Sequence, residues 1–339
     1  MSRITERFWR RLIAAGVLLS LLGLGLGPGR LAAAAGLTRV SFLPQWVPQA
    51  QFAGYYVALE TGIYRQHGLD VQIIDGGPNH SPVDLLLSAK VDFASFWLVT
   101  GLELRSRGVA VVNLAQIVQR SALMLVAKKK NGIFKPADLN GRRVSLWGPP
   151  FAVQPRAFFE RLELDVKPLR QSYSVNLFLR DGVAAASAMW YNEYHTIINS
   201  GLDADELTTF FFADYGLNYP EDGIYALAAT QARRPEICRA FVKASLEGWR
   251  RAFAEPELAL DITMANLHRC HIITNRVHQR WMLERMRDII LPEGEKTRFG
   301  YLQQEDFNRV VKGLQEQKVI GESLPYREFF RPLAAAGAQ

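Results

Sequence analysis

From residue 38 onward the chain alternates short β-rich runs with segments of helical length, and this alternation limits the folds open to it. Runs with strand character cover residues 39–43, 71–74, 91–94 and 110–117, with helical segments between them at 53–61, 82–89 and 98–107. Strands that alternate with helices of this length predict a mostly parallel sheet flanked by helices. The predicted fold class is therefore α/β.

A second series of the same kind follows residue 128. It predicts a turn at residues 136–139, strands at 143–146, 186–189 and 208–213, and helices at 155–162 and 191–200. After residue 230 the pattern changes to helices alone, at 235–254, 256–268, 275–290 and 305–317. Two α/β series in a chain of 339 residues predict two lobes.

Two apolar, β-rich segments bound the second series, Leu123–Lys128 and Ile224–Thr230. If both cross between lobes, the first lobe is discontinuous and a hinge and ligand cleft lie between the lobes. The expected divisions are a leader at 1–35, the first lobe at 36–125, the second at 126–222, the rest of the first lobe with C-terminal helices at 223–331, and a disordered tail at 332–339. A single doubly wound domain with an insertion is the alternative, which periodicity does not exclude.

The first 35 residues have the three parts of an export signal. Three arginines between residues 7 and 11 precede the apolar run Leu12–Leu26, and Ala32–Ala35 offers small-residue cleavage sites. Glycine and serine interrupt this run, which is shorter than the about 20 apolar residues of a membrane span. A cleaved leader is therefore favoured over a retained anchor, and the adjacent pair Arg10-Arg11 leaves a twin-arginine route open. The mature protein is expected outside the cytoplasm.

The positive charge of the chain is concentrated in this leader. The whole sequence carries 40 basic and 33 acidic side chains, whereas residues 31–339 carry 35 and 32. Without a basic stripe, that balance disfavours a nucleic-acid partner.

The two cysteines, Cys238 and Cys270, allow two interpretations. They could pair in an oxidising compartment, but two cysteines do not make a disulfide framework, and buried free thiols are the simpler expectation. The run containing His268, Cys270 and His271 lacks the usual spacing of a zinc site, so no metal is expected.

Motifs that would indicate catalysis are missing from the sequence. It has no G-x-S-x-G elbow, no H-E-x-x-H and no phosphate-binding P-loop, and its six histidines are scattered. We therefore expect a binding protein with no catalytic residues and no cofactor.

Aromatic and polar residues instead gather where predicted strands end, which is where open α/β sheets bind ligands. Rings there can stack on a ligand, amides both donate and accept hydrogen bonds, and glycine allows close backbone approach. Phe52, Tyr55 and Tyr56 lie at helical spacing, and at least one of them is expected in the core rather than at the ligand. Trp190 is expected to pack inward. Trp147 could pack a turn, and Asp222 could serve the hinge. The candidate ligand-binding residues are Trp46, Gln49, Gln51, Tyr55, Gly77, His80, Trp97, Trp147, Tyr191, Asn192, Glu193 and Asp222.

Several of these segments resemble the solute-binding proteins of ABC importers that carry thiamine pyrimidine precursors or, in some members, riboflavin. The resemblance covers about residues 38–255, and its most specific pieces are residues 46–56 (WVPQAQFAGYY) and 76–78 (GGP); other pieces lie at 62–64, 68–71, 135–141, 191–194 (YNEY) and 219–223. It implies a two-lobed periplasmic binding fold of the type II kind that closes on a small heteroaromatic ligand. It also implies an ABC permease as partner, and we expect a monomer. By this analogy Trp46 and Tyr191 stack on the ring, and Glu193 accepts its hydrogen bonds.

The chain departs from the pyrimidine-precursor pattern at two positions. Gln45 stands where the pattern has aspartate, and Phe52 where it has histidine, which favours a larger or less basic ring. One alternative is a carrier of alkanesulfonate, taurine or nitrate, which would want an anion pocket. Another is a pyrimidine synthase on the same fold, which would need cysteines near residues 190–194 where this chain has none. A role in ligand sensing is a further alternative that the sequence does not separate from transport.

Overall fold

A computed structural model describes residues 36–293, 299–322 and 325–332. The expected leader at 1–35 and all but the first residue of the expected tail at 332–339 lie outside the described residues. The prediction for the leader is therefore not tested by the fold. Among the described residues, no helix combines the length and the apolar composition that a membrane crossing requires.

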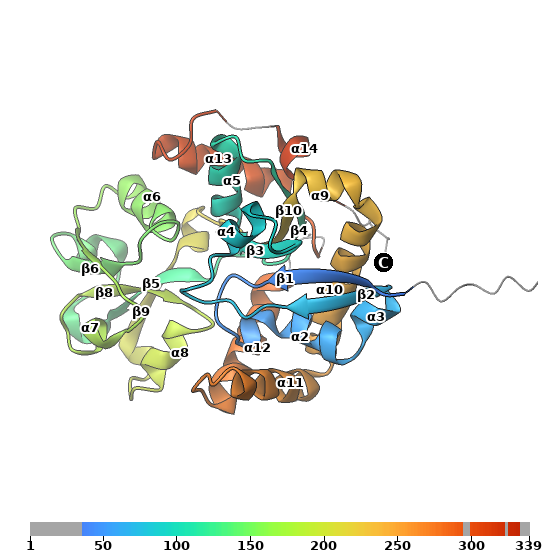
Figure 1. The fold of residues 1–339 in the computed structure, drawn as a ribbon. Helices are drawn as coiled ribbons and strands as arrows, with labels where there is room; N and C mark the ends of the chain where they lie inside the picture. Colours follow the sequence, from blue (N-terminus) through green and yellow to red (C-terminus); the bar gives the residue numbers. More distant parts are fainter. Residues whose placement is uncertain (1–35, 294–298, 323–324, 333–339) are drawn as a thin grey trace, which may run out of the picture. The chain divides into compact units, whose positions relative to one another are not determined.

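The architecture rests on two five-stranded sheets that share one strand order (Figure 1). The first sheet runs β2-β1-β3-β10-β4, and the second runs β7-β6-β8-β5-β9. The first is built from β1 (Thr38–Leu43), β2 (Leu69–Ile73), β3 (Phe93–Trp97), β4 (Val111–Gln116) and β10 (Asp222–Leu227). The second is built from β5 (Leu123–Lys128), β6 (Arg143–Leu146), β7 (Lys167–Arg170), β8 (Ala185–Met189) and β9 (Leu207–Phe211).

Each sheet is mixed, with one strand running against the other four. In the first sheet β1 pairs in parallel with β2 and β3, while β10 is antiparallel to both β3 and β4. In the second sheet β6 pairs in parallel with β7 and β8, while β5 is antiparallel to both β8 and β9. The reversed strands are the two that follow the passages of the chain from one sheet to the other.

Helices accompany the sheet with which they are contiguous in sequence. The helices around the first sheet are η1 (Ala50–Phe52), α2 (Ala53–Glu60), α3 (Ile63–Gln66), α4 (Pro82–Leu87), α5 (Leu98–Ser106), α9 (Ala228–Arg233), α10 (Pro235–Ala254), α11 (Pro256–Arg269), α12 (Arg276–Ile290), α13 (Gln304–Glu316) and α14 (Tyr326–Phe329). Those around the second are η2 (Lys129–Asn131), η3 (Pro136–Leu139), α6 (Val153–Arg161), α7 (Asn176–Leu179), α8 (Glu193–Ile198), η4 (Ala204–Glu206) and η5 (Phe212–Tyr215).

Helix α10 shows why the first lobe is tightly packed. Proline at its first turn starts the helix without losing a backbone hydrogen bond, and its buried face presents Phe241 to the sheet. The Phe241 ring stacks on Phe93 of β3, with ring centroids 4.2 Å apart. Where α10 crosses α2, a Cβ at Gly248 would lie 2.3 Å from the backbone oxygen of Gly54, so only glycine fits there.

The two-lobed α/β architecture predicted from the sequence is confirmed, with some differences in individual elements. Leu123–Lys128 is strand β5, but only the first four residues of the segment 224–230 are strand, because helix α9 begins at Ala228. Strand β7 and helix α7 were not expected; β7 is exposed along its length, so no buried apolar run marks it. The chain passes between the sheets through residues 117–122 and 212–221. The exact lobe boundaries remain a prediction.

Candidate functional site

A chain of buried amides leads from the loop after β1 to the start of β10. Gln49 donates to Gln51 Oε1 at 2.5 Å, and Gln51 in turn donates to Asp222 Oδ2 at 2.9 Å. Gln45 donates to the other carboxylate oxygen of Asp222. Three of these residues, Gln49, Gln51 and Asp222, were predicted site residues, and the structure brings them together.

Next to Asp222, Glu221 joins the two segments through which the chain passes between the sheets. Its Oε1 accepts from the Ala122 N–H at 2.6 Å and from the Ser121 hydroxyl at 3.1 Å. The Glu221 side chain is fully buried, and its Oε2 finds no hydrogen-bond partner among the described residues. A buried carboxyl oxygen without a partner is costly, so one proton on this group is favoured.

Burial raises the pKa values of both Glu221 and Asp222. Burial raises the pKa of Glu221, and the neighbouring charge of Asp222 raises it further. Burial also raises the pKa of Asp222, against the opposing effect of the Gln51 and Gln45 donors. Carboxyls that titrate near neutral pH can either donate or accept a hydrogen bond.

Tyr191 lies close enough to three carboxyls to be affected by their charge. It is buried, and its pKa is raised well above the usual value by burial first, then by Glu221, Asp222 and Glu193 in that order. These effects place Tyr191 near the acids of the crossing segments and near Glu193 at the start of α8. The hydroxyl stays protonated and can act as a donor.

Glu193 is held by hydrogen bonds from its own turn of the chain. Its Oε2 accepts from the Met189 N–H at 3.0 Å and its Oε1 from the Asn192 amide at 2.9 Å. Burial raises the pKa of Glu193 to about 7, although these bonds act in the opposite direction.

The hydrogen-bond chain continues from Asn192 to two histidines that sequence analysis did not single out. Nε2 of His278 on α12 lies 3.0 Å from Oδ1 of Asn192, and Nδ1 of His278 lies 2.9 Å from Nδ1 of His195 on α8. Because Nε2 of His278 faces an amide oxygen, it carries the proton. The Asn199 amide nitrogen also lies 3.1 Å from Nδ1 of His195. Burial lowers the pKa of both rings, and the charge of His195 lowers that of His278 further.

Two aromatic contacts join the first-lobe loops to the second lobe. The ring of Trp46 lies 5.2 Å from that of Tyr173, between centroids. Trp97, at the end of β3, meets Phe151 edge-to-face at 4.7 Å, and Phe151 lies 5.8 Å from Trp147. The buried Trp97 Nε1 has no hydrogen-bond partner within the described residues. The rings thus come from strand ends of both sheets, as the sequence predicted for Trp46, Trp97 and Trp147.

Other predicted site residues lie apart from this group or serve the core. Tyr55 is 1% exposed and packs between Phe42 and Trp249, which favours the core interpretation that the sequence left open. His80 is exposed and hydrogen-bonds the Asp75 carbonyl, and Gly77 lies beside Val47 with φ of +146°. No contact of His80 with the amides or rings described above is seen.

The other sequence-level expectations can also be placed. Trp190 is half-buried, its ring lies 4.8 Å below the Arg285 guanidinium, and its carbonyl accepts from Trp281 Nε1 at 2.9 Å. Cys238 and Cys270 are both free, the first buried and the second half-buried. Among the described residues no cluster of His, Cys, Asp or Glu could hold a metal ion.

Sequence analysis missed several residues of this region. Phe151 follows the predicted strand at 143–146, so the rule that selected Trp147 would have found it. Tyr173 follows β7, which the sequence did not predict, so the rule would not have found it. Glu221 stands beside Asp222 in the sequence. Only its full burial, which is seen in the structure and not in the sequence, distinguishes it from other acidic residues. His195 and His278 are 83 residues apart, and no pattern in the sequence predicts their contact.

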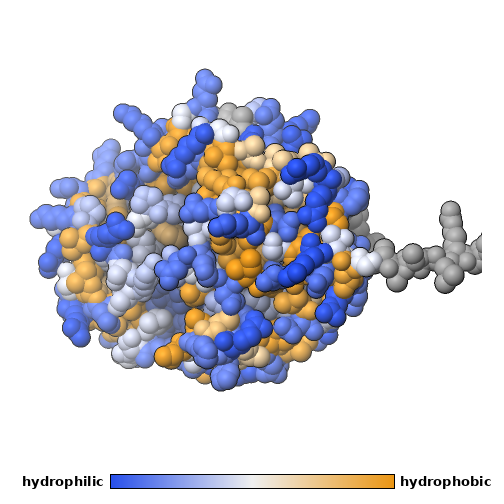
Figure 2. Space-filling model, in the orientation of Figure 1, coloured by the Kyte–Doolittle hydropathy of each residue, from blue (hydrophilic) through white to orange (hydrophobic). Residues whose placement is uncertain are grey.

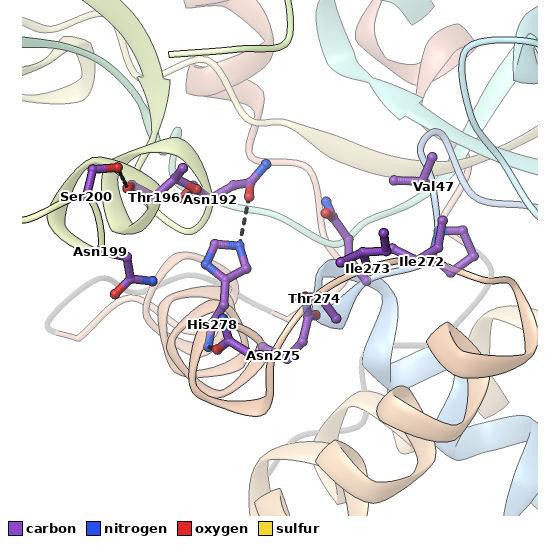
Figure 3. A pocket seen from close by; sticks show the side chains of 13 residues that line it. Val47, Asn192, Thr196, Asn199, Ser200, Ile272, Ile273, Thr274, Asn275 and His278 are labelled. Atoms are coloured by element: carbon purple, nitrogen blue, oxygen red, sulfur yellow. Dashed lines mark hydrogen bonds between the residues drawn. The ribbon is translucent and has the colours of Figure 1, made fainter. Parts of the chain in front are cut away.

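An open cavity of about 400 Å³ lies beside Asn192 and His278 (Figure 3). One part of its wall is the loop 47–49 directly after Trp46, another is α8, and a third is the α11–α12 connection with the start of α12. Figure 3 shows Asn192, Thr196 and Ser200 on one side and Val47, Ile272 and Ile273 on the other. The cavity therefore borders residues of both lobes.

The fold of the chain is that of the two-lobed periplasmic binding proteins. The solved structure of the periplasmic aliphatic sulphonate binding protein SsuA from Escherichia coli superposes with a TM-score of 0.70 over 89% of this chain and 94% of that one, at 12% identity. At that identity the likeness concerns the fold alone.

The family follows from the sequence comparisons. The NMT1/THI5 like family model matches residues 49–259, so the chain belongs to that family. A formylaminopyrimidine-binding protein of Halalkalibacterium halodurans is 25% identical over 84% of this chain and 89% of its own length. The riboflavin-binding protein RibY of Chloroflexus aurantiacus is 25% identical over 67% of this chain and 66% of its own. A 4-amino-5-hydroxymethyl-2-methylpyrimidine phosphate synthase of Schizosaccharomyces pombe is 24% identical over 32% of each chain.

Proposed function

We propose that the mature chain is a periplasmic substrate-binding protein that holds a small heteroaromatic vitamin or vitamin precursor between its lobes and delivers it to an ABC permease. The observation that carries this proposal is the set of aromatic, amide and carboxyl side chains that strand ends of both sheets present to one another. Trp46 and Tyr191 would stack on the ring, and Glu193 would exchange hydrogen bonds with its nitrogen and amino groups. The leader at residues 1–35 would direct export and then be removed.

The proposed ligand-binding residues are those predicted from the sequence, together with Phe151, which contacts Trp97 and Trp147 in the structure. Gln49, Gln51, Asn192 and Asp222 would supply polar contacts, and Trp97 and Trp147 would line the cleft together with Phe151. At Gly77 the backbone would come close to the ligand. Tyr55 and His80 would not contact the ligand directly. Ligand contacts with both lobes would favour the closed form, which the permease would recognise. The protein would work as a monomer.

Two rival functions are less well supported. An alkanesulfonate or nitrate carrier would place cationic or N–H donors at the anion. The side chains gathered here include three carboxyls, which would repel an anion whenever they are ionised. A pyrimidine synthase would need cysteines at residues 190–194. Cys238 lies instead near Arg234 and Asp92, and Cys270 lies near Asp75 and Arg269.

The test is isothermal titration of the mature protein, from Gly36, with riboflavin, formylaminopyrimidine, taurine, an alkanesulfonate and nitrate. We expect binding of a ring compound that Trp46→Ala weakens at least tenfold. Phe134→Ala, which removes an exposed second-lobe ring that is 63% accessible, is the matched control and should leave binding unchanged. Binding of sulfonate or nitrate alone, or equal loss in both variants, would contradict the proposal.

A further inference from the structure

The lining of the cavity next to Asn192 and His278 differs in chemistry from the group of carboxyls formed by Glu193, Glu221 and Asp222. Its polar lining consists of amides and hydroxyls, and none of its lining residues is Asp, Glu, Lys or Arg. The one titratable side chain is His278, whose ring is kept neutral at neutral pH because burial and His195 lower its pKa. Such a wall offers no charge to neutralise a phosphate or a carboxylate.

The polar wall retains hydrogen-bonding capacity for a ligand. The Ser200 hydroxyl donates to the Thr196 carbonyl at 2.8 Å, and the Thr196 hydroxyl donates to the Asn192 carbonyl at 3.3 Å. Both hydroxyl oxygens can therefore still accept a hydrogen bond. Thr196, Asn199 and Ser200 are all exposed, so they need no further protein partner and are accessible to a molecule in the cavity.

The wall on the other side is apolar. Val47 and Pro48 come from the loop that carries Trp46, and Ile272 and Ile273 come from the α11–α12 connection. A chain of hydroxylated carbons has hydroxyls that can meet the amides and C–H groups that can pack on these side chains. The cavity of about 400 Å³ is within the roughly 300–1,000 Å³ range of small-molecule sites.

Sequence neighbours tie the cavity to the ring-binding residues. Val47 directly follows Trp46, and Asn192 directly follows Tyr191 and precedes Glu193. Gln49 and Asn192, two of the predicted ligand-binding residues, themselves line the cavity, so a ring ligand that contacts them would border it. A group there would also touch both α8 of the second lobe and the loop 47–49 of the first.

We propose that this cavity is a subsite for a neutral, hydroxyl-rich side chain carried by the ring ligand, so that the ligand is a heteroaromatic ring with a polyol tail. This inference rests on the proposed function and narrows it, because a bare pyrimidine precursor would leave the cavity unused. A tail ending in phosphate would be disfavoured.

The test compares three flavins by titration of the protein: riboflavin, lumichrome, which has the ring without the polyol, and flavin mononucleotide, whose tail ends in phosphate. We expect riboflavin to bind at least tenfold more tightly than either of the others. Ser200→Phe should fill the cavity and weaken riboflavin at least tenfold, while lumichrome changes less than twofold.

Ser106→Phe is the matched control. Ser106 is also an exposed serine at a helix end, and it donates to the Glu103 carbonyl of its own helix at 2.9 Å. It should change binding of neither flavin. Equal binding of riboflavin and lumichrome, or equal effects of the two variants, would overturn the subsite. Binding of formylaminopyrimidine without any flavin would overturn the subsite and leave the proposed function standing, whereas no binding of any ring compound would overturn both.

Discussion

Two of the sets of contacts between the lobes differ in kind. The hinge contacts are those between residues 117–122 and 212–222, and they include backbone hydrogen bonds from Ile117 and Val118 to the Asp222 carbonyl, each 3.0 Å long. The mouth contacts are Trp46–Tyr173, His195–His278 and Trp190–Trp281. At the hinge the side chains of Ser121 and Glu221 are at most 1% exposed, whereas Tyr173 at the mouth is 69% exposed.

This difference indicates which contacts can part. Breaking the hinge would expose backbone donors and a buried carboxyl together, which is costly. Each mouth contact involves at least one side chain, and side chains can separate by rotating and form hydrogen bonds to water instead. On the face shown in Figure 2, hydrophobic areas lie among hydrophilic residues. We therefore expect opening to occur at the mouth, with the hinge intact.

The largest effect should come from deleting the hinge carboxyl. Glu221→Leu leaves the Ala122 N–H and the Ser121 hydroxyl without their acceptor in a buried site. We expect the free energy of unfolding to fall by about 2–3 kcal/mol, measured by urea denaturation at pH 5, where the wild-type carboxyl is protonated. An unchanged midpoint would show that the hinge is not held in this way.

The next effect is the pH dependence of the same group. Its pKa is raised in the folded state, so its contribution to stability is greatest at low pH and is lost as pH rises from about 4.5 through the folded pKa. Glu221→Gln keeps the acceptor oxygen and removes the titration. We expect the variant to gain about 1–3 kcal/mol over wild type between pH 5 and pH 8. If the free energies of unfolding of wild type and Glu221→Gln changed in parallel with pH, the titration of Glu221 would not be the cause of the pH dependence.

The mouth should show the opposite pH dependence. His195 and His278 have lowered pKa values when folded, so their stabilising contact is complete above pH 6.5 and weakens as pH falls below it. A second proton would place two N–H groups face to face. We expect His195→Phe, which preserves packing on Trp281, to lose less stability than wild type on acidification from pH 7 to 5, by about 1 kcal/mol. His80→Phe is the exposed control, and an identical change there would exclude the histidine pair as the cause.

The smallest effect belongs to the exposed ring of the mouth. Tyr173→Ala removes a side chain that contacts Trp46 but buries little surface. We expect the free energy of unfolding to change by less than about 0.5 kcal/mol in the same denaturation experiment. A loss above about 1.5 kcal/mol would mean that the mouth supports the fold as strongly as the hinge does.

The sequence predicts those helices and strands that are determined by local pattern, and it does not predict those that depend on tertiary contacts. The alternation of strands and helices predicted both lobes, and the four C-terminal helices appear close to their expected bounds, because periodicity and proline starts are local signals. The exposed strand β7 has no apolar pattern, so pairing with β6 alone defines it.

The candidate site was predictable only where a strand end marks it. That rule found Trp46, Trp97 and Tyr191, and applied more widely it would also have found Phe151. It would not have found Tyr173, because strand β7 before it was not predicted. It did not find the pair His195 and His278, because their contact is made by two helices brought together by tertiary packing. The rule also did not distinguish Tyr55, a core residue, from ligand-binding residues, because its burial in the first-lobe core depends on packing against α10.

The measurement that tests the central claim most directly is backbone hydrogen exchange of the mature protein with and without riboflavin. We predict that residues 46–49, 192–200 and 272–279 gain protection when the ligand is added. The amides of Ile117, Val118 and Ala122 should be strongly protected in both states. Protection gained at the hinge segments instead, or no change at the mouth, would contradict an account in which the lobes close at the mouth over a ring ligand.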